Sequence, residues 1–447
     1  MRLHDTYTRS LQELPAPPGP VRMYFCGPTV YARTHIGNAR PFLVGMWLRS
    51  WLRSRGYDAV LVHNITDIND KIYDAGPGAS AELAERATQW YLDDVADFGI
   101  GLPDHMPRAT EVVPRIVSFI EQLIANGNAY AVEGDVYFRV SSFADYGKLS
   151  GQRPDQVEEQ EPNSLKEDPR DFALWKANKP ATEDTWWESP WGRGRPGWHI
   201  ECSVMSEQLL GETFEIHGGG LDLVFPHHEN ELAQSRALGH GFARIWTHNG
   251  MLRFVGEKMS KSLGNVVTTR DALDRWGREV LLVYFLSAHW RKPIDFSDET
   301  LAQAAARLET LRNAFTMEPA KHDEPEWERF ADALDDDFDT PAALAVLHDW
   351  AAARQLQLLR RGLAVFGLES VGERDQAPPA VVALAERRAR ARAARDFETS
   401  DRLRDELAAL GWTMRDRADG FDLVRSRRGL DGSADAEMPA APARDRD

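Results

Sequence analysis

The chain has 447 residues, enough for about three domains, and its 43% hydrophobic and 28% charged residues are ordinary for a globular protein. Its formal net charge of −17 opposes non-specific binding to a polyanion, so a nucleic-acid partner would have to meet local basic patches. The two cysteines lie far apart and give no disulfide framework, and no apolar run approaches a membrane span or a signal core. We therefore expect a cytoplasmic protein with no membrane segment.

The first hundred residues predict the opening of a parallel α/β sheet. Residues 21–31 and 59–65 are apolar runs typical of buried strands, and apolar positions over 42–52 repeat at helical spacing. At the first strand-to-helix junction stands His35-Ile36-Gly37-Asn38, where free backbone N–H groups and the helix dipole attract phosphate. Gly37 lets a ligand approach the backbone, and His35 can donate to a phosphate oxygen. The alternative is a helix start with a solvated histidine.

Residues 106–196 predict an insertion within the α/β domain. An amphipathic helix over 114–126 leads to a hairpin of strands at 130–132 and 136–138. Acidic, proline-bearing stretches and a segment rich in tryptophan and glycine follow. The sheet pattern then resumes with strand-like runs at 197–201 and 214–217, so residues 1–105 and 197–250 are expected to form one domain in two halves.

Four side chains are candidates for a metal site. If Pro226 opens a helix, His227 and Glu231 stand four residues apart on one helical face and can reach the same ion. Cys26 and Cys202 each end a strand-like run, and two thiolates with one imidazole and one carboxylate would complete a tetrahedral zinc site. The alternative is two small hydrophobic cysteines and a polar helix start.

Two further segments have nucleotide-binding character. The glycines 218–220 follow a strand and allow a planar ring or a ribose to approach, with Asp222 available for a hydroxyl, although a flexible turn would have the same residues. Lys258 and Lys261 stand in a polar loop bounded by glycines and can meet the charge of a triphosphate. Lysine–serine runs are also common on surfaces.

The remainder of the chain is predicted to be mostly helical. Helical spacing covers 270–287 and 298–317, and a further helix follows Thr340 as its cap and Pro341 as its start. Another helical stretch, 380–410, carries seven arginines between Arg387 and Arg404 and ends in short strands near 412 and 421–423. Such an arginine run is either a partner surface or a solvated helix face. From residue 426 onward the composition predicts disorder.

In their order along the chain, these motifs resemble those of class I aminoacyl-tRNA synthetases, and within that class the cysteinyl-tRNA synthetase family. The HIGH-type tetrapeptide is His35 to Asn38, and the KMSKS loop is Lys258-Met259-Ser260-Lys261-Ser262. The motifs specific to the cysteinyl family are residues 25–31, 64–68, 194–203, 218–223 and 225–231.

The resemblance implies an α/β fold: a Rossmann-type parallel-sheet catalytic domain with an inserted connective segment, then an α-helical bundle and a small anticodon-binding module. The expected parts are the catalytic halves 1–105 and 197–250, the connective segment 106–196, a KMSKS and stem-contact region 251–297, the bundle 298–367, the anticodon module 380–425 and a disordered tail 426–447.

The resemblance also implies the chemistry. One zinc ion per chain would be held by Cys26, Cys202, His227 and Glu231 and would accept the thiolate of L-cysteine, while Mg²⁺ would accompany ATP. His35, Asn38, Lys258 and Lys261 would be catalytic, and ATP would contact His35, Gly37, Asn38, Gly220, Asp222 and Lys261. Thr66 and Trp198 would wall the cysteine pocket. The expected partner is tRNA(Cys), and the expected state is a monomer.

Two departures and two rivals accompany this resemblance. Asn38 stands where the tetrapeptide's name has histidine, and Asn69 stands where the family usually has aspartate, which puts contacts of that loop in doubt. One rival is a cysteine:amino-sugar ligase of mycothiol biosynthesis, which uses the same adenylate chemistry but lacks the module at 380–424. The other is a non-catalytic tRNA-binding paralogue, which the retained His35, Lys258, Lys261 and metal ligands disfavour.

Overall fold

The computed structural model describes residues 1–152, 163–254, 257–258, 267–320, 326–373, 377–417 and 420–425. Contacts divide the chain into two compact units, Met1–Val371 and Gly372–Asp447. The expected tail from residue 426 lies outside the described residues. Among the helices that the structure describes, none is long and apolar enough to cross a membrane.

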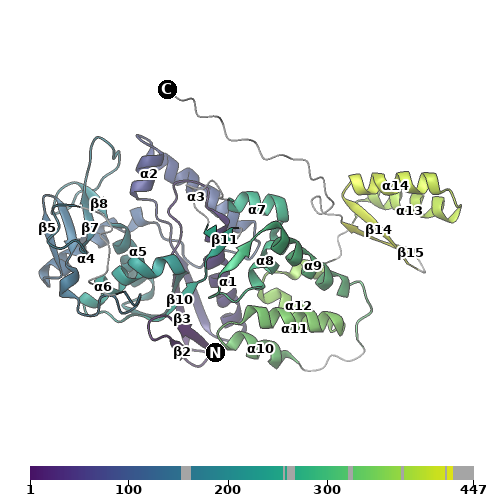
Figure 1. The fold of residues 1–447 in the computed structure, drawn as a ribbon, viewed down its shortest axis with the longest axis horizontal. Helices are drawn as coiled ribbons and strands as arrows, with labels where there is room; N and C mark the ends of the chain where they lie inside the picture. Colours follow the sequence, from purple (N-terminus) through teal and green to yellow (C-terminus); the bar gives the residue numbers. More distant parts are fainter. Residues whose placement is uncertain are drawn as a thin grey trace. The chain divides into compact units, whose positions relative to one another are not determined.

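A four-stranded parallel sheet is the centre of the first unit (Figure 1). Its order is β10 (Phe242–Asn249), β9 (Thr213–Gly220), β3 (Pro20–Phe25) and β4 (Asp58–His63). Most residues of the four strands are buried, including polar ones such as Glu215 and His217, as expected for a parallel sheet that is covered on both faces. This arrangement confirms the predicted α/β fold with a Rossmann-type parallel sheet.

Helix α1 (Ala39–Ser54) connects β3 to β4 and ties the sheet to the helical region. The Trp47 indole N–H donates to the carbonyl of Phe366 at 3.0 Å, and the Trp51 indole N–H donates to Asp335 at 3.0 Å. In the first turn, the buried guanidinium of Arg40 donates to three backbone carbonyls, those of Gly250, His289 and Lys292. Burial lowers the pKa of Arg40 to about 10, so the side chain stays charged at neutral pH.

The insertion carries its own antiparallel sheet, in the order β5-β6-β7-β8. Helix α4 (Val113–Ala125) leads to the hairpin of β5 (Ala129–Val132) and β6 (Asp135–Phe138), as predicted. Strands β7 (Phe172–Ala177) and β8 (Gly194–Pro196) complete it. Figure 1 shows this sheet and helices α9 to α12 at opposite ends of the first unit.

The predicted strand at 197–201 is wrong, because this segment begins helix α5 (Trp198–Leu210). Gly197 is the residue before the helix, with extended backbone angles, and the turn that follows buries Ile200, Glu201 and Cys202. The alternation of Trp, His, Ile and Glu resembled a strand, but a run of five residues does not separate the two periodicities. Cys202 is therefore the fifth residue of a helix, at the start of its second turn.

The remaining elements of the first unit are short strands and helices around these two sheets. They are β1 (Arg2–Asp5), β2 (Ser10–Glu13), α2 (Asp70–Ala75), α3 (Ser80–Ala96), α6 (Glu229–Ala237), β11 (Leu252–Phe254), β12 (Glu257–Lys258), α7 (Thr269–Trp276), α8 (Arg278–Leu286), β13 (Ile294–Phe296), α9 (Asp298–Ala314), α10 (Trp327–Asp335), α11 (Thr340–Ala352) and α12 (Leu356–Val365). The helices predicted over 270–287, over 298–317 and after Thr340 are confirmed as α7 with α8, as α9 and as α11.

One predicted helix cap differs from the structure. The residue that caps α11 is Asp339, whose carboxylate accepts from the backbone N–H of Ala342 at 3.0 Å, and Thr340 is already the first helical residue. Aspartate and threonine both cap helices, so their order at this boundary could not be read from residue type alone.

The second unit consists of two helices and a two-stranded antiparallel ribbon. Its elements are α13 (Pro379–Ala393), α14 (Phe397–Ala409), β14 (Trp412–Arg417) and β15 (Gly420–Arg425). Its small core contains Val381, Ala385, Leu407 and Trp412. Six of the seven arginines between Arg387 and Arg404 are exposed, and Arg388 is half-buried.

Candidate functional site

The candidate residues gather at the carboxyl ends of the central strands. Cys26 directly follows β3, Asn64 directly follows β4, and the glycines 218–220 end β9. Ligands of open parallel sheets bind at this edge, because the strand ends and their loops converge there. The geometry therefore places Cys26, one of the predicted metal ligands, and the predicted glycine run at one edge of one sheet.

The four predicted metal ligands form one buried cluster. One donor atom from each of Cys26, Cys202, His227 and Glu231 lies within 4.8 Å of the others. The two sulfur atoms are 3.9 Å apart, and His227 Nε2 lies 3.0 Å from Glu231 Oε1. Donors around a tetrahedral zinc ion, with bonds of 2.0 to 2.3 Å, are separated by about 3.3 to 3.8 Å. The cluster therefore fits such an ion with small adjustments.

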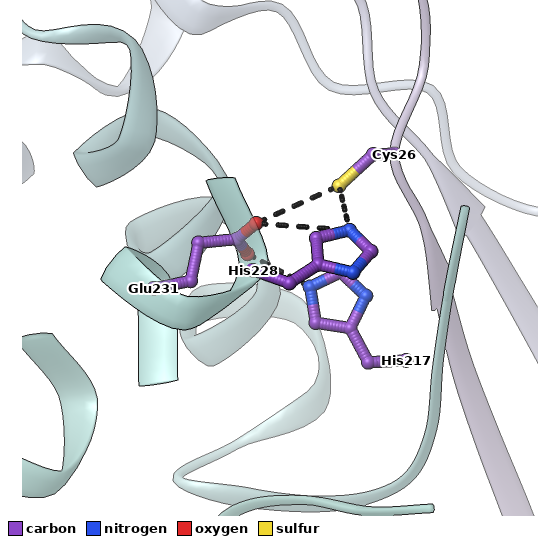
Figure 2. A group of neighbouring side chains, drawn as sticks. All are labelled: Cys26, His217, His228 and Glu231. Carbon is purple, nitrogen blue, oxygen red and sulfur yellow. Dashed lines mark hydrogen bonds and ion pairs between the residues drawn. The ribbon is translucent and has the colours of Figure 1, made fainter. Parts of the chain in front are cut away.

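A second set of donors overlaps the first. It consists of Cys26, His217, His228 and Glu231, again with all donor atoms within 4.8 Å (Figure 2). His228 Nε2 lies 3.3 Å from Cys26 Sγ, and His217 Nε2 lies 2.8 Å from Glu231 Oε2. Sequence reasoning missed both histidines. The only available signals were that His228 adjoins His227 and that His217 precedes the glycine run.

Hydrogen bonding fixes how His217 meets Glu231. His217 Nδ1 lies 3.1 Å from the carbonyl oxygen of Tyr24, which can only accept, so in the neutral ring Nδ1 carries the hydrogen. His217 Nε2 then presents a lone pair to Glu231 Oε2. A proton or a cation must lie between these two acceptors. If Glu231 and His217 were both deprotonated, two lone pairs would face each other, so this pair requires a bound proton or cation.

Burial favours the uncharged forms of Cys26, Cys202, His227, His228 and Glu231. It raises the pKa of the Cys26 thiol well above its ordinary value, and it also raises the pKa values of Cys202 and Glu231. It lowers the pKa values of His227 and His228 well below the ordinary imidazole value. A divalent cation reverses this preference, because it stabilises thiolate and carboxylate and displaces their protons. The set of sulfur, nitrogen and oxygen donors therefore suits zinc.

The predicted pair of His227 and Glu231 lies on consecutive turns, although regular helix starts later than expected. Helix α6 begins at Glu229, and a kinked turn over Val224–His228 precedes it. The spacing of four residues still brings the imidazole and the carboxylate together, as the sequence predicted.

Of the predicted walls of the cysteine pocket, Trp198 contacts the cluster directly and Thr66 is linked to it through Asn64. The Trp198 ring stacks on the His227 ring, with centroids 4.3 Å apart and 22° between the planes. The Thr66 hydroxyl accepts from the amide nitrogen of Asn64 at 3.2 Å, and the Asn64 amide oxygen accepts from the Gly27 N–H at 2.9 Å. The same oxygen lies 3.8 Å from Cys202 Sγ, so Asn64 links the Thr66 loop to the cluster.

The His35 segment differs in part from the predicted phosphate junction. A short turn over Ile36–Asn38 precedes α1, and His35 is extended at its start. Two N–H groups expected to be free are engaged, since Ile36 donates to the carbonyl of Val267 and Asn38 donates to that of His35, each at 2.9 Å. The tertiary contact with residue 267 could not be read from local sequence.

The predicted lysine loop is only partly described. Lys258 is the last residue of β12, and Lys261 lies outside the described residues. Past the loop, the chain returns to the His35 segment, because the Thr269 N–H donates to the carbonyl of Thr34 at 2.9 Å and their hydroxyls lie 3.2 Å apart. The residues that follow the lysine loop are therefore joined to the His35 segment by hydrogen bonds.

The end of β9 presents backbone at the same edge. Gly220 is extended and Asp222 is exposed. A methyl group at Gly218 would lie 2.5 Å from the ring of Phe25, so this strand end must be glycine to pack so closely. The Asn249 amide donates to the carbonyl of Gly219 at 3.1 Å and fixes the strand end.

Three family models match consecutive parts of the chain. The model for the tRNA synthetases class I (C) catalytic domain matches residues 13–306, and a DALR domain model matches 329–368. The model for the cysteinyl-tRNA ligase anticodon binding domain matches 374–421. The chain belongs to the cysteine–tRNA ligase family. The resemblance inferred from the motifs is thereby confirmed.

Relatives named cysteine–tRNA ligase match almost end to end. One from Brevibacillus brevis is 42% identical over 96% of this chain and 99% of its own length. One from Jannaschia sp. is 45% identical over 95% of this chain and 96% of its own length. In fold, methionyl-tRNA synthetase of Mycobacterium tuberculosis in complex with methionyl-adenylate is similar, with a TM-score of 0.59 at 15% identity over 79% of this chain and 89% of that one.

Membership of the cysteine–tRNA ligase family bears on the alternatives and on Asn69. The amino-sugar ligase is not favoured, because the anticodon-domain model matches where that alternative has no module. Asn69 caps helix α2, since its side-chain oxygen accepts from the Lys71 N–H at 3.1 Å. Aspartate, the usual residue of the family, caps equally well, so this departure preserves the local structure.

Proposed function

We propose that this protein activates L-cysteine with ATP and transfers the cysteinyl group to the terminal adenosine of tRNA(Cys). The observation that carries the proposal is the buried cluster of two thiols, an imidazole and a carboxylate, beside Thr66 and Trp198. It lies at the ligand-binding edge of a class I synthetase fold. Sulfur-selective recognition and adenylate chemistry would thus share one site.

The cluster would hold one zinc ion per chain through Cys26, Cys202, His227 and Glu231. This set has two sulfur donors, which zinc prefers over a set with one. Glu231 Oε2 is already engaged by His217, which leaves Oε1 facing His227 and Cys26. With a proton kept between His217 Nε2 and Glu231 Oε2, His217 would orient the carboxylate as an outer partner, as second-shell groups of metal sites do.

When bound, the zinc ion would lower the pKa of the substrate thiol and favour sulfur over the hydroxyl oxygen of serine. The chain's own residues would supply the rest of the recognition. Trp198 and Thr66 would enclose the side chain of cysteine, and the stacking of Trp198 on His227 would keep the pocket narrow and dry. Serine would lose the strongest contact, so a separate editing site would be unnecessary.

The ATP side would act by positioning and charge stabilisation. The cysteine carboxylate would attack the α-phosphate and displace pyrophosphate, whose charge Mg²⁺ would offset, and a ribose hydroxyl of tRNA would then attack the carbonyl carbon of the adenylate and displace AMP. His35, Asn38, Lys258 and Lys261 would contact the phosphates during the first step. Gly37, Gly220 and Asp222 would lie along the nucleotide, the last near its hydroxyl groups.

The second unit would bind the anticodon. Its arginines, exposed on α13 and α14, give a local basic surface on a chain of net charge −17, which is what binding to a polyanion requires. The helices from 298 to 367 would contact the inner corner of tRNA. We further propose that the protein is monomeric and cytoplasmic, with the domain boundaries given above.

The direct test is ATP-dependent transfer of radiolabelled cysteine onto bacterial tRNA, run beside the same assay with glucosaminyl-inositol as the acceptor. Label on tRNA alone is the expected result. Label on the amino sugar alone would overturn the proposal in favour of the ligase, and no transfer with metal bound would favour a binding protein.

A further inference from the structure

A buried ion-pair network joins helix α2 to the insertion. It consists of Asp70, Lys176, Glu183 and Arg195, named here the Asp70 network. Lys176 Nζ lies 2.9 Å from Asp70 Oδ2, and Arg195 Nη2 contacts both Asp70 Oδ1 and, at 3.2 Å, Glu183 Oε1. The side chains of Arg195 and Glu183 are almost fully buried, while that of Asp70 is half-exposed.

Opposite charges in this network offset the effect of burial on the pKa values of Asp70 and Arg195. Burial alone would raise the pKa of Asp70, but the charges of Arg195 and Lys176 lower it below the ordinary value. Burial alone would lower the pKa of Arg195, but Asp70 and Glu183 raise it. Asp70 and Arg195 therefore favour their charged forms, and the fork of Arg195 is shared between two carboxylates from different segments.

The surface where the network lies is incompletely filled by side chains. A cavity of about 230 Å³ lies on one side, lined by residues that include Asn69, Tyr73 and Thr185. A second cavity, of about 350 Å³, adjoins Tyr73 and residues 180–184. The ion pairs of Asp70 are part of what fixes α2 against the insertion, together with the Tyr73 hydroxyl, which lies 2.8 Å from the Thr185 hydroxyl.

Both ends of the Asp70 network are close in sequence to residues of the proposed cysteine pocket. Asp70 is four residues after Thr66, and Arg195 is three residues before Trp198. Between Arg195 and Trp198, the Gly197 N–H donates to the carbonyl of Leu174 at 2.8 Å, and a methyl group at Gly197 would lie 2.0 Å from the carbonyl oxygen of Ala173. Because Gly197 is held by this hydrogen bond and close packing, we expect a shift of β8 to move Trp198 and the start of α5 with it.

We propose that Asp70 is a positioning residue for the cysteine pocket, because its carboxylate holds the Thr66 segment and the Trp198 segment at a fixed separation. The inference rests on the proposed function, in which these two residues wall that pocket. Asp70 touches neither substrate nor metal ligand in this account. It acts through Arg195 and β8 on the Trp198 ring that stacks on His227.

The test is Asp70→Asn, which removes the charge and leaves the size of the side chain. Steady-state ATP–pyrophosphate exchange is expected to show a KM for cysteine about tenfold higher, equivalent to about 1.4 kcal/mol, with the KM for ATP within twofold of wild type. Bound zinc, measured by atomic absorption, is expected to be unchanged. Asp70→Glu keeps the charge on a half-exposed side chain and is expected to recover most of the affinity for cysteine.

Glu167→Gln is the matched control. Glu167 also pairs with an arginine of the insertion, Arg139, at 3.1 Å, but both side chains lie at the surface away from β8. This variant is expected to match wild type in both KM values. Arg195→Lys, which keeps the charge but loses the fork, is expected to fall between wild type and Asp70→Asn.

Three outcomes would overturn the inference. They are an unchanged KM for cysteine in Asp70→Asn, an equal rise in both KM values, or a lowered melting temperature as the only effect. The wild-type protein separates this inference from the function it rests on. If wild type shows no cysteine-dependent exchange, the proposed function fails, whereas wild-type exchange with an unaffected variant rejects only the role of Asp70.

Discussion

The two halves of the candidate site lie on one edge of one sheet but are built differently. The metal cluster is made of side chains from distant segments, and each of its proposed ligands is at least nine-tenths buried. The nucleotide side is made of short local stretches, with a backbone turn at Ile36–Asn38 and the glycine end of β9, and Asp222 is exposed. Selecting sulfur requires converging donors in a dry site, whereas phosphate and ribose can be met by backbone near solvent.

The strongest test of the cluster is Cys202→Ser. Loss of a thiolate ligand is expected to reduce zinc affinity and cysteine activation together by at least about 100-fold, since even outer partners of metal sites are worth 10 to 100-fold. Zinc content and ATP–pyrophosphate exchange measure the two effects. Full activity in a verified zinc-free variant would contradict the proposed role of the metal.

The two overlapping donor sets are separated by a matched set of histidine variants. His227 belongs only to the proposed set, whereas His217 and His228 belong only to the other. His227→Gln is expected to lose zinc as Cys202→Ser does. His217→Gln is expected to retain zinc with affinity lowered by about 10 to 100-fold, because it would orient Glu231 without binding the ion. The reverse ranking would assign the metal to the second set.

The nucleotide side is tested by adding a single methyl group at Gly220. The nearest atom to that methyl would be the carboxylate oxygen of Asp222 at 2.4 Å, the end of an exposed side chain that can rotate away. Gly220→Ala is therefore expected to fold normally and to raise the KM for ATP about tenfold by crowding the nucleotide, with the KM for cysteine unchanged.

Gly218→Ala is the contrasting variant at the same strand end. Its methyl would meet the buried Phe25 ring, so we expect a loss of about 1–3 kcal/mol of stability with both KM values affected. Equal effects of the two alanines on urea unfolding would show that Gly220 is structural.

The last test concerns the pH dependence of stability and His63, the buried last residue of β4. Its Nδ1 donates to the carbonyl of Phe25 at 3.0 Å, and the Tyr91 hydroxyl donates to its Nε2. Burial lowers the pKa of His63 to about 4. In the unfolded chain, the imidazole of His63 binds a proton below about pH 6.5. Stability is therefore lost as the pH falls from about 6.5 toward 4, by about 2 kcal/mol at pH 5 from this residue.

His63→Gln removes the titrating group and isolates this contribution from those of the other histidines. Between pH 7 and pH 5, the urea midpoint of the wild type is expected to fall further than that of the variant. Equal shifts in the two proteins would show that His63 is not the origin of the acid sensitivity.

Local pattern was sufficient for much of the fold and for part of the site. Apolar runs and helical spacing predicted the parallel strands, the hairpin of the insertion and the later helices, and a spacing of four residues predicted the pair of His227 and Glu231. The run at 197–201 was misread as a strand because five residues fit both periods. His217 and His228 were missed because their partners, Tyr24 and His248, are close only in space.

The sequence by itself determined the kinds of donor available, the order of the family motifs and the polarity of each segment, because these depend on residue type and local period. Only the tertiary structure decided that Cys26 and Cys202, 176 positions apart, bring their sulfur atoms within 3.9 Å, and that Asp70 meets Arg195 beneath the pocket. Such contacts arise where parallel strands end together and an insertion folds back. Burial then shifts the pKa values of Cys26, Cys202, His227 and Glu231 toward their uncharged forms.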